Sequence, residues 1–231
     1  YVIDNYEIPQ YIPDQIPEDM GLVSWGYGMS KGEVAKQQIS GVINAGRKTY
    51  FAGATIDWIG FCIDYASTFR ATNTSLSMAH ELGIKDVIMT TWGDDSPERD
   101  YMLTLLGCQI YAEHMYSPII DDERVKERYN FCAISNSDMV LDISDIDTIH
   151  SALEESESDE LVLDEIKGHV NPSKYMLWQD PMMGLFDAEA QKVDFPSHYQ
   201  KYSDKLKSYK GKVKDFDECL DFYIGLCDAL K

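Results

Sequence analysis

Three short apolar runs mark the first half of the chain, and a helical pattern follows each of them. The runs are Gly21–Trp25, Thr49–Ala54 and Asp86–Trp92. Their apolar residues are continuous rather than alternating, which is typical of parallel strands that are covered on both faces. We therefore predict three parallel strands, each followed by a helix.

The helical patterns have recognisable ends. A glycine follows each of the first two patterns, at Gly46 and Gly83, as is common after the last turn of a helix. The third pattern opens with Ser96 as a cap and Pro97 at the first helical position, and it continues to Met115. The order β-α-β-α-β-α implies a parallel sheet with right-handed crossovers. Three strands alone do not decide between an open doubly wound sheet and a closed barrel.

Strand signals end near Ser117, and helical or loop patterns occupy the remainder. We accordingly divide the chain into an α/β part, residues 1–117, and a mainly helical domain, residues 118–231. In the second part we expect three helices, an acidic solvated stretch and a loop-rich stretch. The three helices are Asp121–Cys132, Ser197–Tyr209 and Lys214–Leu230. The acidic stretch is Glu154–Glu165, and the loop-rich stretch is Asn171–Asp187.

The net charge and the cysteines indicate which partners and which cellular compartment to expect. Forty acidic residues against 20 basic ones give a formal charge of −20, which repels phosphate backbones and anionic lipids, so we expect neither a nucleic acid nor a membrane partner. The 5 cysteines form no Cys-x-x-Cys pair, which favours reduced thiols and a cytoplasmic location. Because the sequence opens at Tyr1 without a methionine, we expect the native N-terminus to lie upstream.

A tryptophan ends or closely follows each predicted strand: Trp25, Trp58 and Trp92. Ligands of parallel α/β folds bind at the carboxyl ends of the strands. Aromatic faces stack on the C–H patches of sugars while carboxylates accept bonds from sugar hydroxyls, so this pattern favours a carbohydrate site. The alternative interpretation is that these large side chains simply plug the end of a barrel.

Asp94 and Asp95 supply the carboxylates of this region. Adjacent residues of an extended segment point in different directions, so one can face a ligand while the other caps the following helix or supports the first from behind. A divalent metal is the rival interpretation, with Asp57 and Asp64 as the further oxygen ligands. No second acidic cluster at a neighbouring strand end supports a metal site, so we predict no metal. No phosphate-binding loop, nucleophile elbow or Cys/His nucleophile pair is present, and we predict no cofactor.

The chain resembles the N-acetyl-β-hexosaminidases of glycoside hydrolase family 20, in the bacterial branch of exo-β-D-N-acetylglucosaminidases. The resemblance covers most of residues 1–187 and rests on a combination of motifs. They are Leu22-Val23-Ser24-Trp25-Gly26-Tyr27; Phe51-Ala52-Gly53 with Trp58-Ile59-Gly60-Phe61; Thr91-Trp92-Gly93-Asp94-Asp95 with Glu98; and Asn171-Pro172-Ser173-Lys174-Tyr175 leading to Gln179-Asp180-Pro181 and Gly184-Leu185-Phe186-Asp187.

This resemblance implies that the chain is the C-terminal part of a (β/α)8 barrel enzyme, with strands six to eight followed by a helical domain. It implies substrate-assisted retaining hydrolysis, in which the acetamido oxygen of the sugar attacks the anomeric carbon. The Asp-Glu pair that orients the acetamide and protonates the leaving oxygen follows strand four in this family. We therefore expect that pair upstream of Tyr1.

The family's site residues transfer to this chain one by one. The resemblance implies that Trp25, Trp58 and Trp92 wall the sugar pocket, that Tyr27 bonds the acetamide oxygen, and that Asp94 grips the distal sugar hydroxyls. A departure lies at Ile56, where related sequences carry tryptophan, and Asp57 is expected to add a charge at the same rim.

The leading hypothesis is thus a fragment of an exo-β-N-acetylhexosaminidase that removes terminal N-acetylglucosamine or N-acetylgalactosamine. The chain would provide the pocket walls without the acid/base pair, would be inactive alone, and would self-associate through its uncovered sheet edges. The alternatives are a non-catalytic carbohydrate-binding protein on a decayed barrel, suggested by Ile56, and an unrelated α/β domain with a metal at Asp94 and Asp95.

Overall fold

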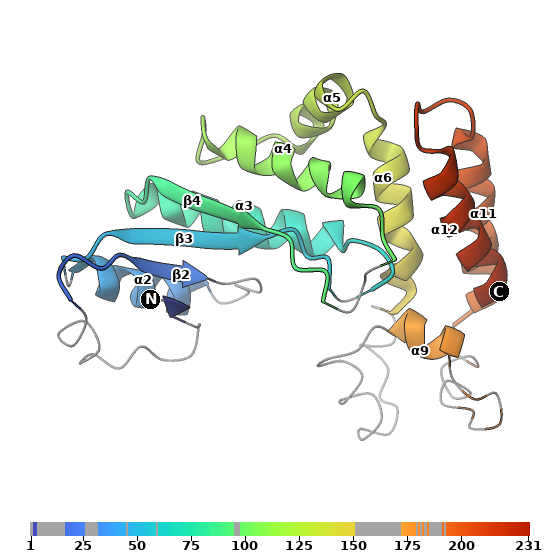
Figure 1. The fold of residues 1–231 in the computed structure, drawn as a ribbon, viewed down its shortest axis with the longest axis horizontal. Helices are drawn as coiled ribbons and strands as arrows, with labels where there is room; N and C mark the ends of the chain where they lie inside the picture. Colours follow the sequence, from blue (N-terminus) through green and yellow to red (C-terminus); the bar gives the residue numbers. More distant parts are fainter. Residues whose placement is uncertain are drawn as a thin grey trace. The chain divides into compact units, whose positions relative to one another are not determined.

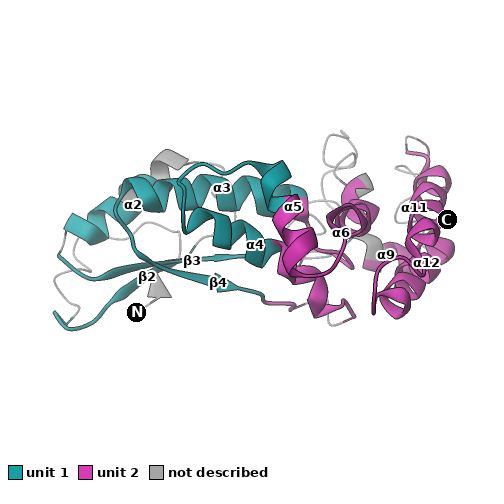
Figure 2. Ribbon diagram, turned by 90° about the horizontal axis from the view of Figure 1, so that it is seen from above, with its two compact units in different colours: residues 1–56, 66–91, 107–125 teal, residues 57–65, 92–106, 126–231 magenta. Residues whose placement is uncertain are grey.

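The structure is a computed structural model in which two compact units are defined. It describes residues 2–3, 17–25, 32–44, 46–58, 60–94, 98–150, 172–178, 180, 182, 184, 191 and 193–231. Unit 1 comprises Tyr1–Ile56, Ala66–Thr91 and Gly107–Val125, and unit 2 comprises Asp57–Tyr65, Trp92–Leu106 and Lys126–Lys231 (Figure 2). The domain boundary expected near Ser117 stays a prediction.

Unit 1 is built on a parallel sheet in which the strands follow chain order (Figure 1). The sheet contains β1 (Val2–Ile3), β2 (Leu22–Trp25), β3 (Thr49–Ala54) and β4 (Asp86–Thr90). The register pairs Trp25 with Ala52 and Ala54 with Thr90. The three predicted strands are confirmed. β1 is an additional strand, and its two residues are too few to form a recognisable sequence pattern.

Helices cover the sheet of unit 1 on one face (Figure 2). They are α2 (Gly32–Asn44), α3 (Tyr65–Glu81) and α4 (Leu105–His114). Their apolar residues meet β3 in one core, formed by Ile39, Phe51, Leu76, Met78 and Tyr111. Burial of these side chains is the main stabilising contribution within the unit.

The helix ends follow the sequence signals in two cases. Gly46 and Gly83 both have positive φ, 71° and 72°, and end the turns after α2 and α3 as predicted. Ser96 and Pro97, the predicted start of the third helix, lie outside the described residues; the described helical segment begins at Tyr101, where the Asp100 carboxylate acts as cap and accepts a bond from the Met102 amide at 2.8 Å. A 3-10 turn, η1 (Tyr101–Thr104), then leads into α4.

The expectation of strands covered on both faces holds for β3 but is wrong for β4. Phe51, Ala52 and Ala54 of β3 are all buried. In β4, the edge strand of the sheet, Val87 and Ile88 are 40% and 44% exposed. No layer of described residues therefore covers these two apolar side chains.

Unit 2 is mainly helical beyond residue 126. Its elements are the end of α5 (Asp122–Cys132), α6 (Ser137–Ser144), η2 (Asp145–His150), α9 (Pro172–Trp178), α11 (Phe195–Tyr209) and α12 (Asp217–Leu230). The last two pack against each other as a hairpin, with Gly211 at φ 70° in the connection (Figure 1). Large side chains such as Tyr199, Leu206, Leu220 and Tyr223 fill this unit's core.

The predicted helices over Asp121–Cys132, Ser197–Tyr209 and Lys214–Leu230 correspond to α5, α11 and α12. The loop expected over Asn171–Asp187 is wrong at its start, because Pro172 opens α9. The acidic stretch Glu154–Glu165 lies outside the described residues. Within the described part of the chain, no helix is both long and apolar enough to span a bilayer.

Candidate functional site

Two strand-end segments of unit 2 are joined by one carboxylate. Asp57 follows β3, and Trp92 and Gly93 follow β4. The Asp57 Oδ1 atom accepts hydrogen bonds from the Trp92 amide at 3.0 Å and from the Gly93 amide at 3.4 Å. The turn that carries Trp92 is thereby attached to the residue that precedes Trp58.

Arg99 completes this contact. Its Nη2 lies 2.6 Å from Asp57 Oδ2, and its Nη1 donates to the backbone carbonyl oxygen of Asp57. The two side chains are 1% and 0% exposed, so the charges compensate each other away from water. The expectation that Asp57 adds a charge at the pocket rim is therefore wrong: its carboxylate is buried and paired.

The Asp57 carboxyl is subject to opposing influences. Desolvation, the largest, raises its pKa above the ordinary value, while the bond from the Trp92 amide and the Arg99 charge limit that rise. Arg99 also places its Cζ atom 5.4 Å from the centroid of the Tyr101 ring. The guanidinium thus contacts both a carboxylate and an aromatic ring.

Gly93 is required by this geometry. Its φ is 65°, in the left-handed region, and a Cβ atom added there would lie 2.8 Å from Arg99 Nη2. Only glycine allows the backbone to turn here with the guanidinium so close. On either side of Gly93, Trp92 is 47% exposed and Asp94 is exposed, so both side chains meet solvent.

The predicted site residues fall into three groups. Trp58, Trp92 and Asp94 belong to unit 2, with the first two in segments that Asp57 joins. Trp25 ends β2 in unit 1, level with Ala52 of β3. It is the last residue of its strand, whereas Trp58 and Trp92 lie four and two residues beyond theirs.

Two of the predicted site residues, Tyr27 and Asp95, lie outside the described residues. Ile56, which stands where related sequences carry tryptophan, is 5% exposed, and its amide donates to Thr68 Oγ1 at 2.9 Å. That the three tryptophans wall one pocket stays a prediction.

Helices of unit 2 hold the loop that follows Trp58. Tyr223 of α12 donates its hydroxyl to the Phe61 carbonyl oxygen at 3.0 Å. The Asp147 carboxylate accepts from the Cys62 amide at 2.8 Å, and the Ser144 hydroxyl accepts from the Tyr65 amide at 3.0 Å. The loop is therefore fixed by side chains that lie far along the sequence.

A further contact involves the segment after Asp94. Lys174 of α9 pairs with Glu98 at 2.9 Å and lies 5.4 Å from the centroid of the Phe61 ring. Together with Tyr223, it ties the strand-end segments to the helical part of the same unit.

Metal chemistry finds little support in the residues that are described. Among them no group of three or more His, Cys, Asp or Glu side chains could hold an ion. Two histidines on helices of unit 1 are engaged locally: His80 Nε2 contacts the His114 carbonyl oxygen, and His114 Nε2 lies 3.1 Å from Asn73 Oδ1. Desolvation lowers the pKa of His114, which favours its neutral form.

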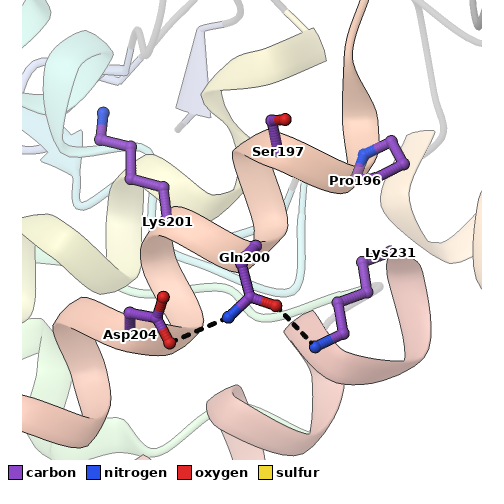
Figure 3. Close-up of a pocket in the computed structure, with 6 residues that line it drawn as sticks. All are labelled: Pro196, Ser197, Gln200, Lys201, Asp204 and Lys231. Carbon is purple, nitrogen blue, oxygen red and sulfur yellow. Dashed lines mark hydrogen bonds between the residues drawn. The ribbon is translucent and has the colours of Figure 1, made fainter.

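A surface depression of about 520 Å³ lies on α11 (Figure 3). Gln200 links its neighbours there, donating to Asp204 at 2.9 Å and accepting from Lys231 at 2.9 Å. The lining residues are Pro196, Ser197, Gln200, Lys201, Asp204 and Lys231, and none of them is a predicted site residue. Gln200 therefore already pairs with two of its polar neighbours in this depression.

Sequence reasoning missed Arg99, Asp147 and Tyr223 as supports of the strand-end segments. Arg99 follows the Trp92–Asp94 motif closely, but nothing in the sequence links it to Asp57, 42 residues earlier. Asp147 and Tyr223 are 85 and 162 residues from their partners. The one available signal was Gly93, because a glycine beside a cluster of polar residues suggests a close backbone approach.

Comparison with known proteins bears on the helical part. Residues 150–231 match the family model described as the Glycoside Hydrolase 20C C-terminal domain. A search of curated proteins gave no match. The matched residues include α9, α11 and α12, which lie in the same unit as the Asp57–Arg99 contact. Over these residues the chain is similar to the C-terminal domain of glycoside hydrolases of family 20.

Proposed function

We propose that the chain is the C-terminal part of an exo-β-N-acetylhexosaminidase that removes terminal N-acetylglucosamine or N-acetylgalactosamine. The observation that carries this proposal is the match of residues 150–231 to the Glycoside Hydrolase 20C C-terminal domain. The motifs around Trp25, Trp58 and Trp92 point to the same family, and they lie outside the matched range.

The sheet supports a barrel as the parent fold. Doubly wound sheets reverse their strand order at a switch point, whereas the strands of a (β/α)8 barrel follow chain order. The order β1-β2-β3-β4 contains no reversal. If β2, β3 and β4 are barrel strands six, seven and eight, β1 is strand five.

In the proposed mechanism, this chain binds and orients the sugar. Trp58 and Trp92 stack on its C–H faces, Asp94 accepts bonds from its distal hydroxyls, and Tyr27 donates to the acetamide oxygen. The acetamide oxygen then attacks the anomeric carbon, and water later opens the cyclic intermediate with retention. The carboxylates that orient the acetamide and protonate the leaving oxygen come from upstream of this chain.

The exposed edge strand supports the idea of a larger parent. Val87 and Ile88 of β4 would be covered once further barrel strands and helices are added. The isolated chain is accordingly proposed to self-associate, and light scattering at micromolar concentration tests this: a monodisperse monomer would contradict it. The 5 free cysteines are compatible with the cytoplasmic location that we also propose.

The complete gene product tests the proposed function directly. We expect it to hydrolyse 4-nitrophenyl N-acetyl-β-D-glucosaminide or the galactosaminide, and NMR should show the β-anomer as the first product. The 231-residue chain alone should show no turnover. Sugar binding without turnover by the complete protein would favour the carbohydrate-binding alternative, and neither binding nor turnover would refute the proposal.

A further inference from the structure

The segment from Trp92 to Arg99 is attached to Asp57 at both of its ends. At one end the Asp57 carboxylate accepts the amides of Trp92 and Gly93. At the other end Arg99 contacts both the carboxylate and the backbone carbonyl oxygen of Asp57. Asp94 lies between these two attachment points in the sequence. Its backbone position is therefore set by contacts that its neighbours make with Asp57.

The nature of the contact indicates what it contributes. A buried ion pair adds little net stability compared with apolar side chains of equal volume, because desolvation offsets the attraction. What the contact does supply is direction, because hydrogen bonds accompany the ion pair: Arg99 Nη1 donates to the Asp57 carbonyl oxygen, and Asp57 Oδ1 accepts from the Trp92 and Gly93 amides. The requirement for glycine at position 93 agrees with a turn that must keep one conformation.

We infer that Asp57 and Arg99 are positioning residues for the sugar site: they clamp the Trp92–Gly93–Asp94 turn so that Asp94 faces the hydroxyls of the terminal sugar. This inference rests on the proposed function, because Asp94 has a sugar to bind only there. Neither Asp57 nor Arg99 touches the substrate, since both side chains are buried.

The first arm of the test measures the clamp without any substrate. Asp57→Asn keeps the shape of the side chain but replaces a charged acceptor by a weaker neutral one. We expect hydrogen exchange of the Trp92 and Gly93 amides to accelerate at least about tenfold, which corresponds to about 1.4 kcal/mol. Asp86→Asn is the matched control, because Asp86 forms an exposed pair with Lys48 at 3.0 Å at the other end of β4; these amides should be unchanged in it.

The second arm measures the site in the complete gene product. Asp57→Asn and the milder Arg99→Lys should raise KM about tenfold for a terminal N-acetylglucosaminide, because Asp94 no longer meets the hydroxyls. A purely structural role would lower Tm and the folded fraction, and so the maximal rate, without moving KM. If Asp57→Asn does not fold, Arg99→Lys decides.

The outcomes separate the two claims. Faster amide exchange together with a raised KM supports the clamp. Unchanged exchange and unchanged KM in folded variants of an active enzyme overturn the clamp and leave the proposed function standing. A wild-type gene product that neither binds nor cleaves the sugar overturns the proposed function, and with it the sugar role of the clamp.

Discussion

The two units hold their residues in place by different means. In unit 1, apolar side chains of α2, α3 and α4 meet the sheet around Phe51, which is fully buried. In unit 2, the strand-end segments around Trp58 and Trp92 are fixed by single polar contacts such as Tyr223 to Phe61 and Arg99 to Asp57. Apolar packing tolerates small shifts, whereas such polar contacts specify the position of individual backbone atoms.

This difference suits a scaffold and a site. The sheet requires only that its faces be covered, and many apolar residues meet that need. A pocket requires side chains at defined points, which hydrogen bonds and ion pairs from surrounding residues can provide. The helical part of unit 2 supplies Asp147 and Tyr223 to the loop after Trp58, and Tyr223 lies in the segment with the glycoside hydrolase match. Its role, in this account, is to position that loop.

The largest effect is expected in the apolar core of unit 1. Phe51→Ala removes a fully buried ring from β3 and should destabilise the unit by about 3–5 kcal/mol, from lost burial and the cavity left behind. Hydrogen exchange should show lost protection in β3 and α3 and retained protection in α11 and α12. Val87→Ala, at a site that is 40% exposed, should cost less than about 1 kcal/mol. An equal loss of protection in both units would show that the apolar core around Phe51 does not stabilise unit 1 specifically.

An intermediate effect is expected for Tyr223. Tyr223→Phe leaves the Phe61 carbonyl oxygen without its 3.0 Å donor and should cost about 1–3 kcal/mol in urea unfolding. Tyr199→Phe is the matched control, because Tyr199 is equally buried and, within the described part of the chain, its hydroxyl donates to the Met176 sulfur at the long distance of 4.0 Å. Similar costs for the two variants would show that the bond to Phe61 does not fix the loop.

The smallest effects concern the thiols, whose reactivity reports local opening. Cys62, Cys219 and Cys227 are buried, and desolvation raises the pKa of Cys219 and of Cys227 to about 12. Since the thiolate is the reactive form, these three should resist a thiol reagent at pH 8 in the folded chain. Mass spectrometry after labelling should instead find Cys132 and then Cys108 modified, the latter more slowly because desolvation raises its pKa. Early labelling of Cys62 would contradict the fixed loop.

The sequence predicted the parts of the fold that depend on local pattern. β3 coincides with the predicted run Thr49–Ala54, and Gly46 and Gly83 mark the ends of two helices as expected. The helix α6 was missed although Asn136 caps it, with its side chain accepting from the Met139 amide at 3.0 Å. That signal was present and was overlooked in a short, weakly periodic segment.

The site was less predictable, for a physical reason. Tryptophans at strand ends can be found from the position of the strands alone. The partner of a buried charge cannot be found in this way, because the chain between Asp57 and Arg99 can take many courses that do not bring these two side chains together. Asp57 was therefore expected at the rim, whereas the structure buries it beneath Trp92 and Gly93 through contacts with their amides.

The central claim is that Asp94 grips the terminal sugar, and steady-state kinetics of the complete gene product tests it most directly. Asp94→Asn keeps the shape of the exposed side chain but loses charge-assisted bonds worth about 1.5–3 kcal/mol. We expect kcat/KM on a terminal N-acetylglucosaminide to fall about 10- to 150-fold. Asp95→Asn should have a smaller effect and Asp86→Asn none, with circular dichroism melts confirming folding. A well-folded Asp94→Asn enzyme with near-wild-type kcat/KM would contradict the account.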